Sequence, residues 1–197
     1  MQKKIILASS SPRRIEMMKN HGFDPVIIKP ECEENLPAGI SGSDAVLFLS
    51  YKKAHTVEKM LLASPDAEEY KDAYIVAADT IVYLDGIIGK PQDRQDCIRM
   101  MNHLNGRTHY VLTGVTIIRC GTAVRTSFFD ETRVFFREYT DQFIQKYADT
   151  AEPYDKAGGY AIQGTMGQYI DHIEGDMNNV IGFPWDRFEE ELNKLGD

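Results

Sequence analysis

The first half of the chain alternates short apolar runs with helical patterns. The run "KIILA" (3–7) predicts a buried strand, the segment 12–21 a helix, and the run "DPVIIKP" (24–30) a second strand. A long helix then begins at Ser43 or Asp44, because apolar residues recur there at helical spacing, at Val46, Leu47, Leu49, Ala54, Val57 and Leu61. Strands that alternate with helices favour an α/β fold.

The middle of the chain predicts a hairpin followed by a helix. Two apolar runs within residues 73–91 flank Asp85 and Gly86, a pair that is common in two-residue hairpin turns. The segment 93–104 then shows helical spacing of its apolar residues. Because a hairpin adds antiparallel pairing, we expect a mixed sheet.

Two long β runs follow, at 108–120 and 123–138, and they are joined at Gly121. Their alternating apolar and polar residues predict antiparallel neighbours in the sheet. The remaining predicted elements are a helix over 141–148, a glycine-rich loop over 154–167, a strand over 169–173 and a helix from Trp185. No repeat or clear linker interrupts the chain, so residues 1–197 are expected to form a single domain with helices flanking the mixed sheet.

The composition is that of an ordinary globular protein. The chain has 197 residues, of which 43% are hydrophobic, so it is long enough to bury a core. Its 30 acidic residues outnumber 22 Lys and Arg, and the net charge of −8 argues against an extended surface for a nucleic-acid polymer or an anionic membrane. A partner that carries phosphate is therefore expected to bind locally.

The cysteines and the hydropathy favour a cytoplasmic protein. Cys32, Cys97 and Cys120 are odd in number and far apart, which suggests reduced thiols rather than a disulfide framework or a zinc site. The first apolar run ends at once in "SSSPRR", unlike the core of a signal peptide. No stretch approaches the roughly 18 apolar residues that a membrane span needs.

The segment "LASSSPRR" (7–14) breaks a local rule of helix formation. Ser11 and Pro12 suit the start of a helix, where the serine can cap free N–H groups. Arg13 and Arg14, however, place two cations in the first turn, where the helix dipole favours acids. Two guanidinium groups beside backbone N–H groups could bind a phosphate or a carboxylate. The alternative is that both arginines point to solvent.

Acidic residues near two predicted strand ends could bind a divalent cation. Asp79 separates the apolar runs "YIVAA" and "TIVYL", so we expect its carboxylate near the core at the end of a strand. Glu31, Glu33 and Glu34 follow the second predicted strand. Together with Asp79 they could hold Mg²⁺ or Mn²⁺ through oxygen ligands. Alternatively, Asp79 could form a hydrogen bond with the backbone of its own turn, and the three glutamates could lie in a loop that only contacts solvent.

Two lysines and a glycine-rich segment complete the candidate residues. Lys53 lies on the apolar stripe of its predicted helix, whereas the neighbouring Lys52 is turned about 100° away. Lys90 stands between a glycine and a proline after an apolar pair. The segment 155–169 resembles a phosphate loop but lacks the lysine of a Walker A motif, and Gln163 within it could read the edge of a base. Alternatively, the two lysines could be solvated surface residues, and the glycine-rich segment could be only a tight loop between two elements.

Eight segments follow one another along nearly the whole chain: "LASSSPRR", "EENLP", "KKA", "AADTIV", "GKP", "LNGRTHYVLTGV", "EPYDKAGGYAIQG" and "IEGDMNNVIGFP". Together they resemble the successive motifs of the Maf family of nucleoside triphosphate pyrophosphatases. The resemblance implies a mixed α/β fold with two lobes around a cleft, similar to the inosine triphosphate pyrophosphatases. It also implies hydrolysis of a nucleoside triphosphate between its α and β phosphates with Mg²⁺ or Mn²⁺, and a homodimer.

The resemblance implies a role for each matching residue. The positions that match the family's functional residues are Ser9, Arg13, Arg14, Glu34, Lys53, Asp79, Lys90 and Gln163. Glu34 and Asp79 would hold the cation, with Asp79 as proton acceptor, while the choice between Glu33 and Glu34 stays open. The two arginines would bind the triphosphate, and the two lysines would stabilise charge on the reacting phosphates.

The base preference implied by the resemblance comes from "ADT" (78–80), which is similar to the branch that acts on dTTP and UTP. Thr80 and Gln163 would line the base pocket. Departures from the family's motifs occur at Ser50, at Ala161 and at residues 177–178, and the last two could alter the base preference. Two other functions stay open: a nucleotide-binding regulator of cell division that does not hydrolyse, and a phosphatase that releases orthophosphate.

Overall fold

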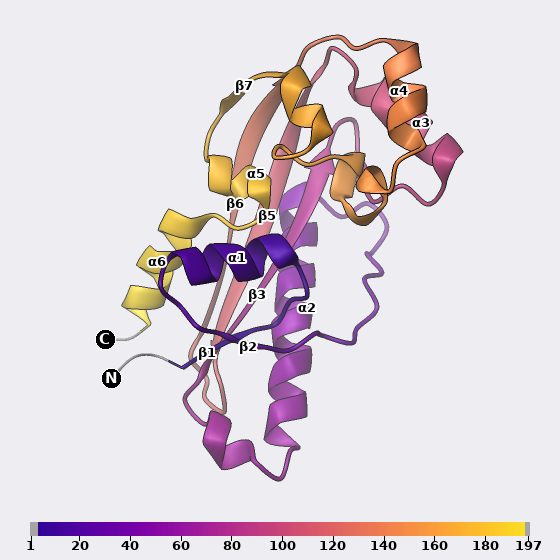
Figure 1. The fold of residues 1–197 in the computed structure, drawn as a ribbon. Coiled ribbons are helices and arrows are strands. Elements are labelled where there is room, and N and C mark those ends of the chain that lie inside the picture. The colour runs from indigo at the N-terminus through magenta and orange to yellow at the C-terminus, as the bar shows by residue number, and fades with distance from the viewer. Residues whose placement is uncertain (1–3, 196–197) are drawn as a thin grey trace. The chain divides into compact units, whose positions relative to one another are not determined.

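A mixed β-sheet organises the fold (Figure 1). In the computed structural model, which describes residues 4–195, the strand order is β2-β1-β3-β5-β6-β7, and β4 pairs with β3. The strands are β1 (Ile5–Leu7), β2 (Val26–Ile27), β3 (Tyr74–Tyr83), β4 (Ile87–Ile88), β5 (Thr108–Arg119), β6 (Arg125–Phe136) and β7 (Ile170–Glu174). β1 is parallel to β2 and β3, whereas β4 is antiparallel to β3 and β7 to β6. The predicted α/β class with a mixed sheet is confirmed.

Helices connect most of these strands. The α-helices of the described residues are α1 (Pro12–Asn20), α2 (Gly42–Leu62), α3 (Arg94–Leu104), α4 (Asp141–Ala148), α5 (Met177–Ile181) and α6 (Trp185–Lys194). Short 3-10 helices occupy Ala67–Tyr70, Glu152–Asp155, Ala157–Gly159 and Thr165–Tyr169. The start of α2 was predicted one or two residues late, because Ser41 is its cap: the Ser41 hydroxyl accepts a hydrogen bond from the Asp44 N–H at 3.1 Å.

The described residues divide into two compact units. The first unit contains the residues up to Asp79, Gly114–Phe129 and the residues from Gly182 onward. The second unit contains Thr80–Thr113 and Asp130–Ile181. β3, β5 and β6 contribute residues to both units. The prediction of a single domain over the whole chain stays a prediction.

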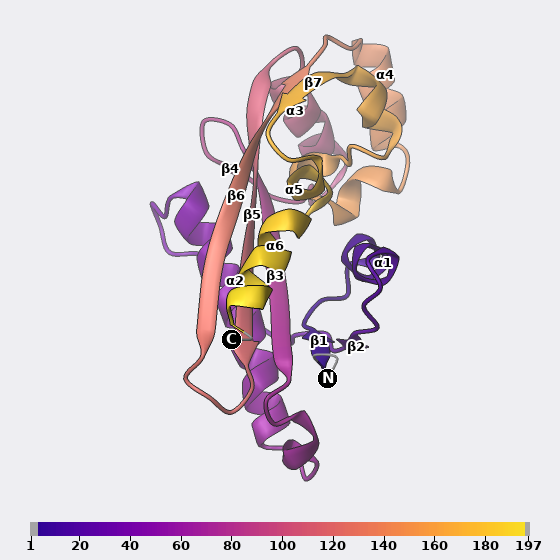
Figure 2. The same cartoon turned by 90° about the vertical axis from the view of Figure 1, so that its left-hand side faces the viewer.

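In the first unit, α2 packs on one face of the strands and α6 on the other, as can be followed in Figure 2. The α2 face is an aliphatic cluster that includes Ile6, Ala8, Ala54, Val57, Leu61, Ala73, Ile75, Ala77 and Ile118. On the other face, the Tyr74 hydroxyl donates to the Leu195 carbonyl at the end of α6, at 3.1 Å. α2 approaches the sheet closely at Gly114, where a Cβ would lie 2.4 Å from the Val46 carbonyl oxygen. Gly114 therefore fixes the height of α2 above the strands.

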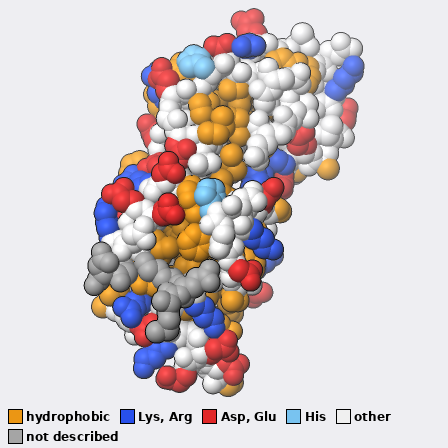
Figure 3. All heavy atoms as spheres, turned by 60° about the vertical axis from the view of Figure 1, so that its left-hand side comes forward, with side chains coloured by type: hydrophobic (Ala, Val, Ile, Leu, Met, Phe, Trp, Pro, Cys, Tyr) orange, Lys and Arg blue, Asp and Glu red, His pale blue; other side chains and the backbone are white. Residues whose placement is uncertain are grey.

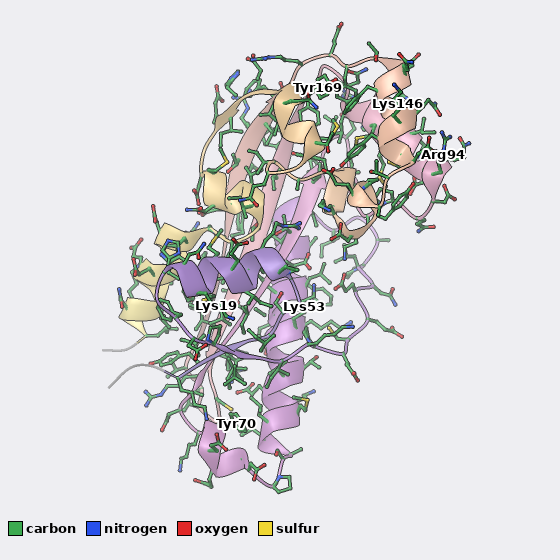
Figure 4. All side chains as sticks on the ribbon, viewed as in Figure 1. Lys19, Lys53, Tyr70, Arg94, Lys146 and Tyr169 are labelled. Carbon is green, nitrogen blue, oxygen red and sulfur yellow. The ribbon has the colours of Figure 1, made fainter. Side chains whose placement is uncertain are left out.

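The second unit has a more aromatic core. Its cluster combines side chains of α3, α4 and the strand ends, among them Met101, Leu104, Val111, Phe136, Tyr139, Ile144, Tyr147 and Tyr160. The rings of Phe136 and Tyr160 meet edge to face, with their centroids 4.9 Å apart. At the surface, Arg94 of α3, labelled in Figure 4, binds Asp149 after α4 at 2.6 Å. Ring contacts thus do much of the packing in this unit.

The structure corrects several predictions. Asp79 lies inside β3 and not at a strand end, because Thr80, Ile81 and Val82 continue the β-favouring pattern. β2 is only Val26–Ile27, and both of its residues are exposed. Of the strand predicted over 3–7, residues Ile5–Leu7 form β1, and Lys3 lies outside the described residues.

Two further differences concern short helices. The predicted glycine-rich loop over 154–167 contains parts of three 3-10 helices. Helix α5 was not predicted, because it is only five residues long and "MNNVI" has low helix propensity. The other predicted elements are confirmed: the hairpin between β3 and β4, helices α1, α3, α4 and α6, the neighbours β5 and β6, and strand β7.

The three cysteines form no disulfide, and one face of the molecule carries charges of both signs. Cys32, Cys97 and Cys120 are all free thiols. Figure 3 shows acidic and basic side chains interspersed on one face of the molecule, so neither sign dominates that face. Within residues 4–195, no helix is both long enough and apolar enough to cross a lipid bilayer.

Candidate functional site

The centre of the candidate site is a lysine held between two carboxylates in the first unit. The Lys53 Nζ lies 2.5 Å from Asp79 Oδ1 and 2.8 Å from Glu34 Oε1. The side chains of Lys53 and Asp79 are only 12% and 10% exposed, whereas that of Glu34 is 51% exposed. The structure therefore brings three predicted site residues together: Glu34 from the loop between β2 and α2, Lys53 from α2 and Asp79 from β3.

The alternation of β3 and the periodicity of α2 explain this meeting. Ile75 and Ala77 belong to the cluster on the α2 face, and Asp79 follows them at the same two-residue spacing. Lys53 lies one turn before the buried Val57 on α2, so it faces the strands, as Figure 4 shows for the labelled side chain. Lys53 and Asp79 thus face each other at one end of the otherwise aliphatic contact between α2 and β3.

Two neighbouring glutamates of the acidic loop have different partners. Glu34 binds Lys53, whereas the Glu33 carboxylate accepts a hydrogen bond from the Asn35 side chain at 3.0 Å. Glu31 is exposed, and within residues 4–195 it makes no ion pair with Lys53. Of the acidic loop, Glu34 is the residue that reaches the cluster.

Burial and charge act against each other in this cluster. Burial raises the pKa of the Asp79 carboxyl, although the charges of Lys53 and Arg14 partly offset it. Burial is the largest single influence on the pKa of Lys53 and lowers it, but the charges and hydrogen bonds of Asp79 and Glu34 together outweigh burial and leave that pKa raised. Lys53 therefore stays an ammonium, and Asp79 is a better proton acceptor than an exposed aspartate.

The start of α1 lies open instead of being capped by a side chain. Ser11 occupies the cap position, but its side chain makes no capping hydrogen bond, contrary to our expectation. Ser9 is buried, and its hydroxyl accepts from the Ser11 N–H at 3.1 Å. The first-turn N–H groups of α1 are thus not capped by Ser11, and α1 has no acidic residue in that turn.

Arg14 points inward, so the solvent alternative is wrong for this arginine. Its Nε donates to the Gly182 carbonyl at 2.9 Å, and its Nη1 lies 3.5 Å from the Ser9 hydroxyl. Burial lowers the pKa of Arg14, while the Asp79 charge opposes this and the Arg13 charge adds to it. Arg13 is partly exposed. At the start of α1, Arg14 is therefore held by hydrogen bonds, whereas Arg13 is partly exposed to solvent.

The other three predicted residues, Thr80, Lys90 and Gln163, belong to the second unit and are described within it. Thr80 directly follows Asp79 on β3, and its hydroxyl lies 2.9 Å from that of Thr113. Lys90 is exposed after β4. The backbone next to it is fixed, because the Gly158 N–H donates to the Gly89 carbonyl at 2.8 Å.

Gln163 stands at the tip of a tight turn. The Gly164 N–H donates to the Ala161 carbonyl at 3.0 Å, and the Gln163 side chain between them is exposed. The next residue, Thr165, is held by Glu152, whose carboxylate accepts from the Thr165 N–H at 2.8 Å and from its hydroxyl at 2.6 Å. A Cβ at position 164 would lie 2.1 Å from Glu152 Oε1, so a larger residue there would displace this carboxylate.

Sequence reasoning missed a buried polar chain beneath Thr80. Thr113 and Asn179 are fully buried, and the Thr113 hydroxyl donates to the Asn179 carbonyl at 3.0 Å. The signal was available, since a threonine in the apolar run "VLTGV" and an asparagine in "NNVIG" need partners when they are buried. Their pairing could not be read from positions 66 residues apart.

The carboxylates of Glu34 and Asp79 fit a hard divalent cation that arrives with phosphate. An oxygen of each lies within 2.8 Å of the Lys53 Nζ, so the two carboxylates converge on one point. A magnesium ion commonly takes one or two protein carboxylates and fills its remaining positions with phosphate oxygens and water. Among residues 4–195, no group of three or more His, Cys, Asp or Glu could hold a metal ion. The donor set therefore suits a cation whose other ligands are phosphate oxygens and water, rather than an all-protein cage.

Comparisons with known proteins point to one family. The family described as Maf-like protein matches residues 4–195. A dTTP/UTP pyrophosphatase of Acetivibrio thermocellus is 40% identical over 194 residues, which cover 98% of this chain and 96% of that protein. A protein of the same name from Dictyoglomus turgidum is 39% identical over 197 residues, which cover 100% and 98%. The solved Staphylococcus aureus Ham1 protein aligns with 14% identity and a TM-score of 0.46 over 85% of this chain and 80% of that chain.

Proposed function

The chain belongs to the family of Maf-like proteins, and we propose that it is a nucleoside triphosphate pyrophosphatase that acts on dTTP and UTP. It would release the nucleoside monophosphate and pyrophosphate. The observation that carries the proposal is the buried contact of Asp79 with Lys53, which Glu34 completes. A carboxylate with a raised pKa beside a fixed ammonium suits proton transfer near a charged phosphate.

Asp79 is proposed as the proton acceptor. A water oxygen would form a bond to the α-phosphorus while the bond from that phosphorus to the bridging oxygen of the β-phosphate breaks. The proton of the water would pass to Asp79, and pyrophosphate would leave with the electron pair. The Lys53 bond to Oδ1 holds the carboxylate in place and leaves Oδ2 as the atom that would take the proton.

Cations around the carboxylate would hold the triphosphate. Arg13, Arg14 and the uncapped N–H groups of α1 would bind phosphate oxygens, with Ser9 supporting Arg14. Lys53 would stabilise charge on the α-phosphate, and Lys90 charge on the leaving pyrophosphate. A divalent cation held by Glu34 and Asp79 would neutralise further negative charge.

The base would be read by the second unit. Thr80 and Gln163 are proposed to line the base pocket, and the fixed turn around Gln163 supports this role because it holds the backbone from which the Gln163 side chain extends. The relatives' names provide the choice of dTTP and UTP. The resemblance also predicts a cytoplasmic homodimer, whose oligomeric state analytical ultracentrifugation would test.

A product assay tests the function. The protein is incubated with Mg²⁺ and each of the common nucleoside triphosphates, and pyrophosphate, orthophosphate and nucleoside monophosphate are measured. We expect equimolar pyrophosphate and monophosphate, with dTTP and UTP as the best substrates. Orthophosphate alone would indicate a phosphatase. Tight binding without turnover would indicate a regulator, and either outcome would overturn the proposal.

A further inference from the structure

Helix α1 is poorly supported by its own sequence. It has only nine residues, and isolated helices shorter than roughly 12 residues are marginal in water. Its cap residue Ser11 makes no capping hydrogen bond, and the first turn holds two arginines and no acidic residue, although the helix dipole favours acids there. The position of α1 therefore depends on its contacts with other parts of the first unit.

One short segment, from Gly182 to Trp185, contacts both ends of this helix. At the start of α1, the Gly182 carbonyl accepts a hydrogen bond from Arg14 Nε at 2.9 Å. At the end of α1, the ring of His21 stacks on that of Trp185, with centroids 3.8 Å apart and 19° between the ring planes. Arg14 and His21 are seven positions apart, which is about 10 Å along a helix, and three residue steps of extended chain also span about 10 Å. The segment thus matches α1 in length and contacts it at both ends.

The stacked pair is rigidly attached on both sides. His21 Nδ1 lies 2.9 Å from the Met17 carbonyl oxygen, and because a carbonyl can only accept, Nδ1 donates there. The ring that covers Trp185 is therefore tied to the backbone of the last turn of α1. Trp185 is only 3% exposed, and the rings of Phe23 and Phe188 contact it with centroids 5.6 and 5.3 Å away. A shift of the indole would thus move the whole of α1, including its first turn.

We propose that Gly182, Trp185 and His21 are positioning residues that hold the start of α1 in place for the triphosphate. This inference rests on the proposed function, in which Arg13, Arg14 and the first-turn N–H groups bind phosphate oxygens. The three residues act through α1 and do not touch the nucleotide. Contacts to the triphosphate that are made before and during the reaction lower KM and leave kcat unchanged. Loss of the positioning residues should therefore raise KM without a comparable fall in kcat.

The first test compares His21→Ala with His21→Phe. Alanine removes the stacked ring, whereas phenylalanine keeps a flat ring against Trp185. We expect His21→Ala to raise KM for UTP by about fivefold, the effect of one aromatic pair, with kcat within about twofold of wild type. His21→Phe is expected to stay near the wild-type KM. An unchanged KM in a folded His21→Ala protein would overturn the inference.

A matched control separates positioning from stability. His172 of β7 stacks on Phe135 with ring centroids 4.0 Å apart and 14° between the planes, nearly the geometry of the His21 pair. His172→Ala removes this ring and should lower the melting temperature comparably, but it should leave KM for UTP unchanged. If KM rose equally in both alanine variants, the rise would report a general loss of stability, and the inference would be rejected.

The other end of α1 is tested by Gly182→Ala. Gly182 has a φ of +116°, which is strained for alanine, so the substitution should shift the carbonyl that receives Arg14 Nε. We expect a rise in KM of about fivefold, again with kcat within about twofold of wild type. Gly121→Ala is the control, since Gly121 has a φ of +75° in the turn between β5 and β6. Equal KM values in the two variants would contradict the role of Gly182.

Binding without hydrolysis separates this inference from the proposed function. Calorimetry with Mg²⁺ and α,β-methylene-UTP, whose bond between the α and β phosphates resists hydrolysis, measures Kd directly. We expect Kd to rise about fivefold in His21→Ala and to stay at the wild-type value in His172→Ala. This result in a protein that hydrolyses no nucleoside triphosphate would reject the proposed activity and support the positioning role. Failure of the wild-type protein to bind the analogue would overturn the inference itself.

Discussion

Asp79 and Thr80 are consecutive residues of β3, yet their side chains have partners of different kinds. Asp79 binds the Lys53 ammonium, which also binds Glu34, whereas Thr80 binds the neutral hydroxyl of Thr113. Charged groups in a poorly solvated place act strongly on a developing charge, while a neutral hydrogen bond discriminates by about one order of magnitude. We therefore expect the charged cluster to control turnover and the neutral chain to control the choice of base.

The largest effect is expected at Asp79. Asp79→Asn keeps the shape and can still accept from Lys53, but it cannot take up a proton. We expect kcat to fall by about 10³-fold, within the range for loss of a general base. Pyrophosphate release measures this, and circular dichroism checks the fold. Wild-type turnover in a folded Asp79→Asn protein would break the comparison, because the charged cluster would then have no chemical role.

The next effect separates two adjacent lysines. Lys53→Met should lower kcat by about 10²-fold, because it removes the ammonium between two carboxylates. Lys52→Met is the matched control, since Lys52 is half-buried like Lys53 but its Nζ lies 5.8 Å from the centre of the Phe48 ring and not between two carboxylates. We expect its kcat to stay near wild type. Equal losses in both variants would assign the effect to the helix surface and contradict our assignment.

A third prediction concerns a buried neutral group of the second unit. His109 is fully buried, its Nε2 lies 2.6 Å from the Tyr160 hydroxyl, and burial lowers its pKa from 6.5 to about 4. As pH falls below 6.5, the unfolded chain therefore takes up this proton before the folded protein does. The free energy of unfolding should fall by about 3 kcal/mol down to pH 4 and then level off for this group.

The histidine prediction is measured by urea unfolding at several pH values. His109→Gln should be less stable at pH 7 but should lose less stability on acidification, because glutamine does not titrate. A wild-type slope in His109→Gln would show that other groups cause the acid loss.

The smallest expected effect is at a carboxylate that we assign to structure and not to chemistry. Glu152→Gln weakens two hydrogen bonds from Thr165, so we expect the free energy of unfolding to fall by about 1 kcal/mol. Glu174→Gln is the control, since Glu174 pairs with Arg133 at an exposed position and should cost less. Thermal unfolding measures both. If kcat fell more in Glu152→Gln than in Lys53→Met, Glu152 would have a role in the reaction, and its assignment to structure alone would be wrong.

Much of the fold could be predicted from the chain because its elements are strongly patterned. The apolar stripe of α2 predicted both the helix and the inward position of Lys53, and the Asp85-Gly86 turn predicted the hairpin. Aspartate is rare inside strands, so we predicted a strand end at Asp79. The prediction was wrong, because the residues after Asp79 continue the β-favouring pattern and β3 extends to Tyr83. Local propensity could not reveal that Lys53 would make a buried aspartate acceptable.

The candidate site was predicted unevenly. Arginines at a helix start and an aspartate in an apolar strand are conspicuous because each breaks a local rule. Glu152 breaks no such rule, and the apolar runs around Thr113 and Asn179 indicated only that these two residues would need partners, not which partners they have. Their partners are distant in sequence: Thr113 and Asn179 are 66 residues apart, and Glu152 and Thr165 are 13 apart. Only folded contacts identify residues of this kind.

The sequence by itself determined the alternation of strands and helices, the family resemblance and the identity of the charged groups. These follow from periodicity and from residue types that are costly to bury or to place in a helix start. The tertiary structure alone decided that Glu34 and not Glu33 meets Lys53, that Arg14 turns inward, and that the hydroxyls of Thr80 and Thr113 lie 2.9 Å apart. The physical reason is that hydrogen bonds depend on distance and direction, which a linear pattern does not contain.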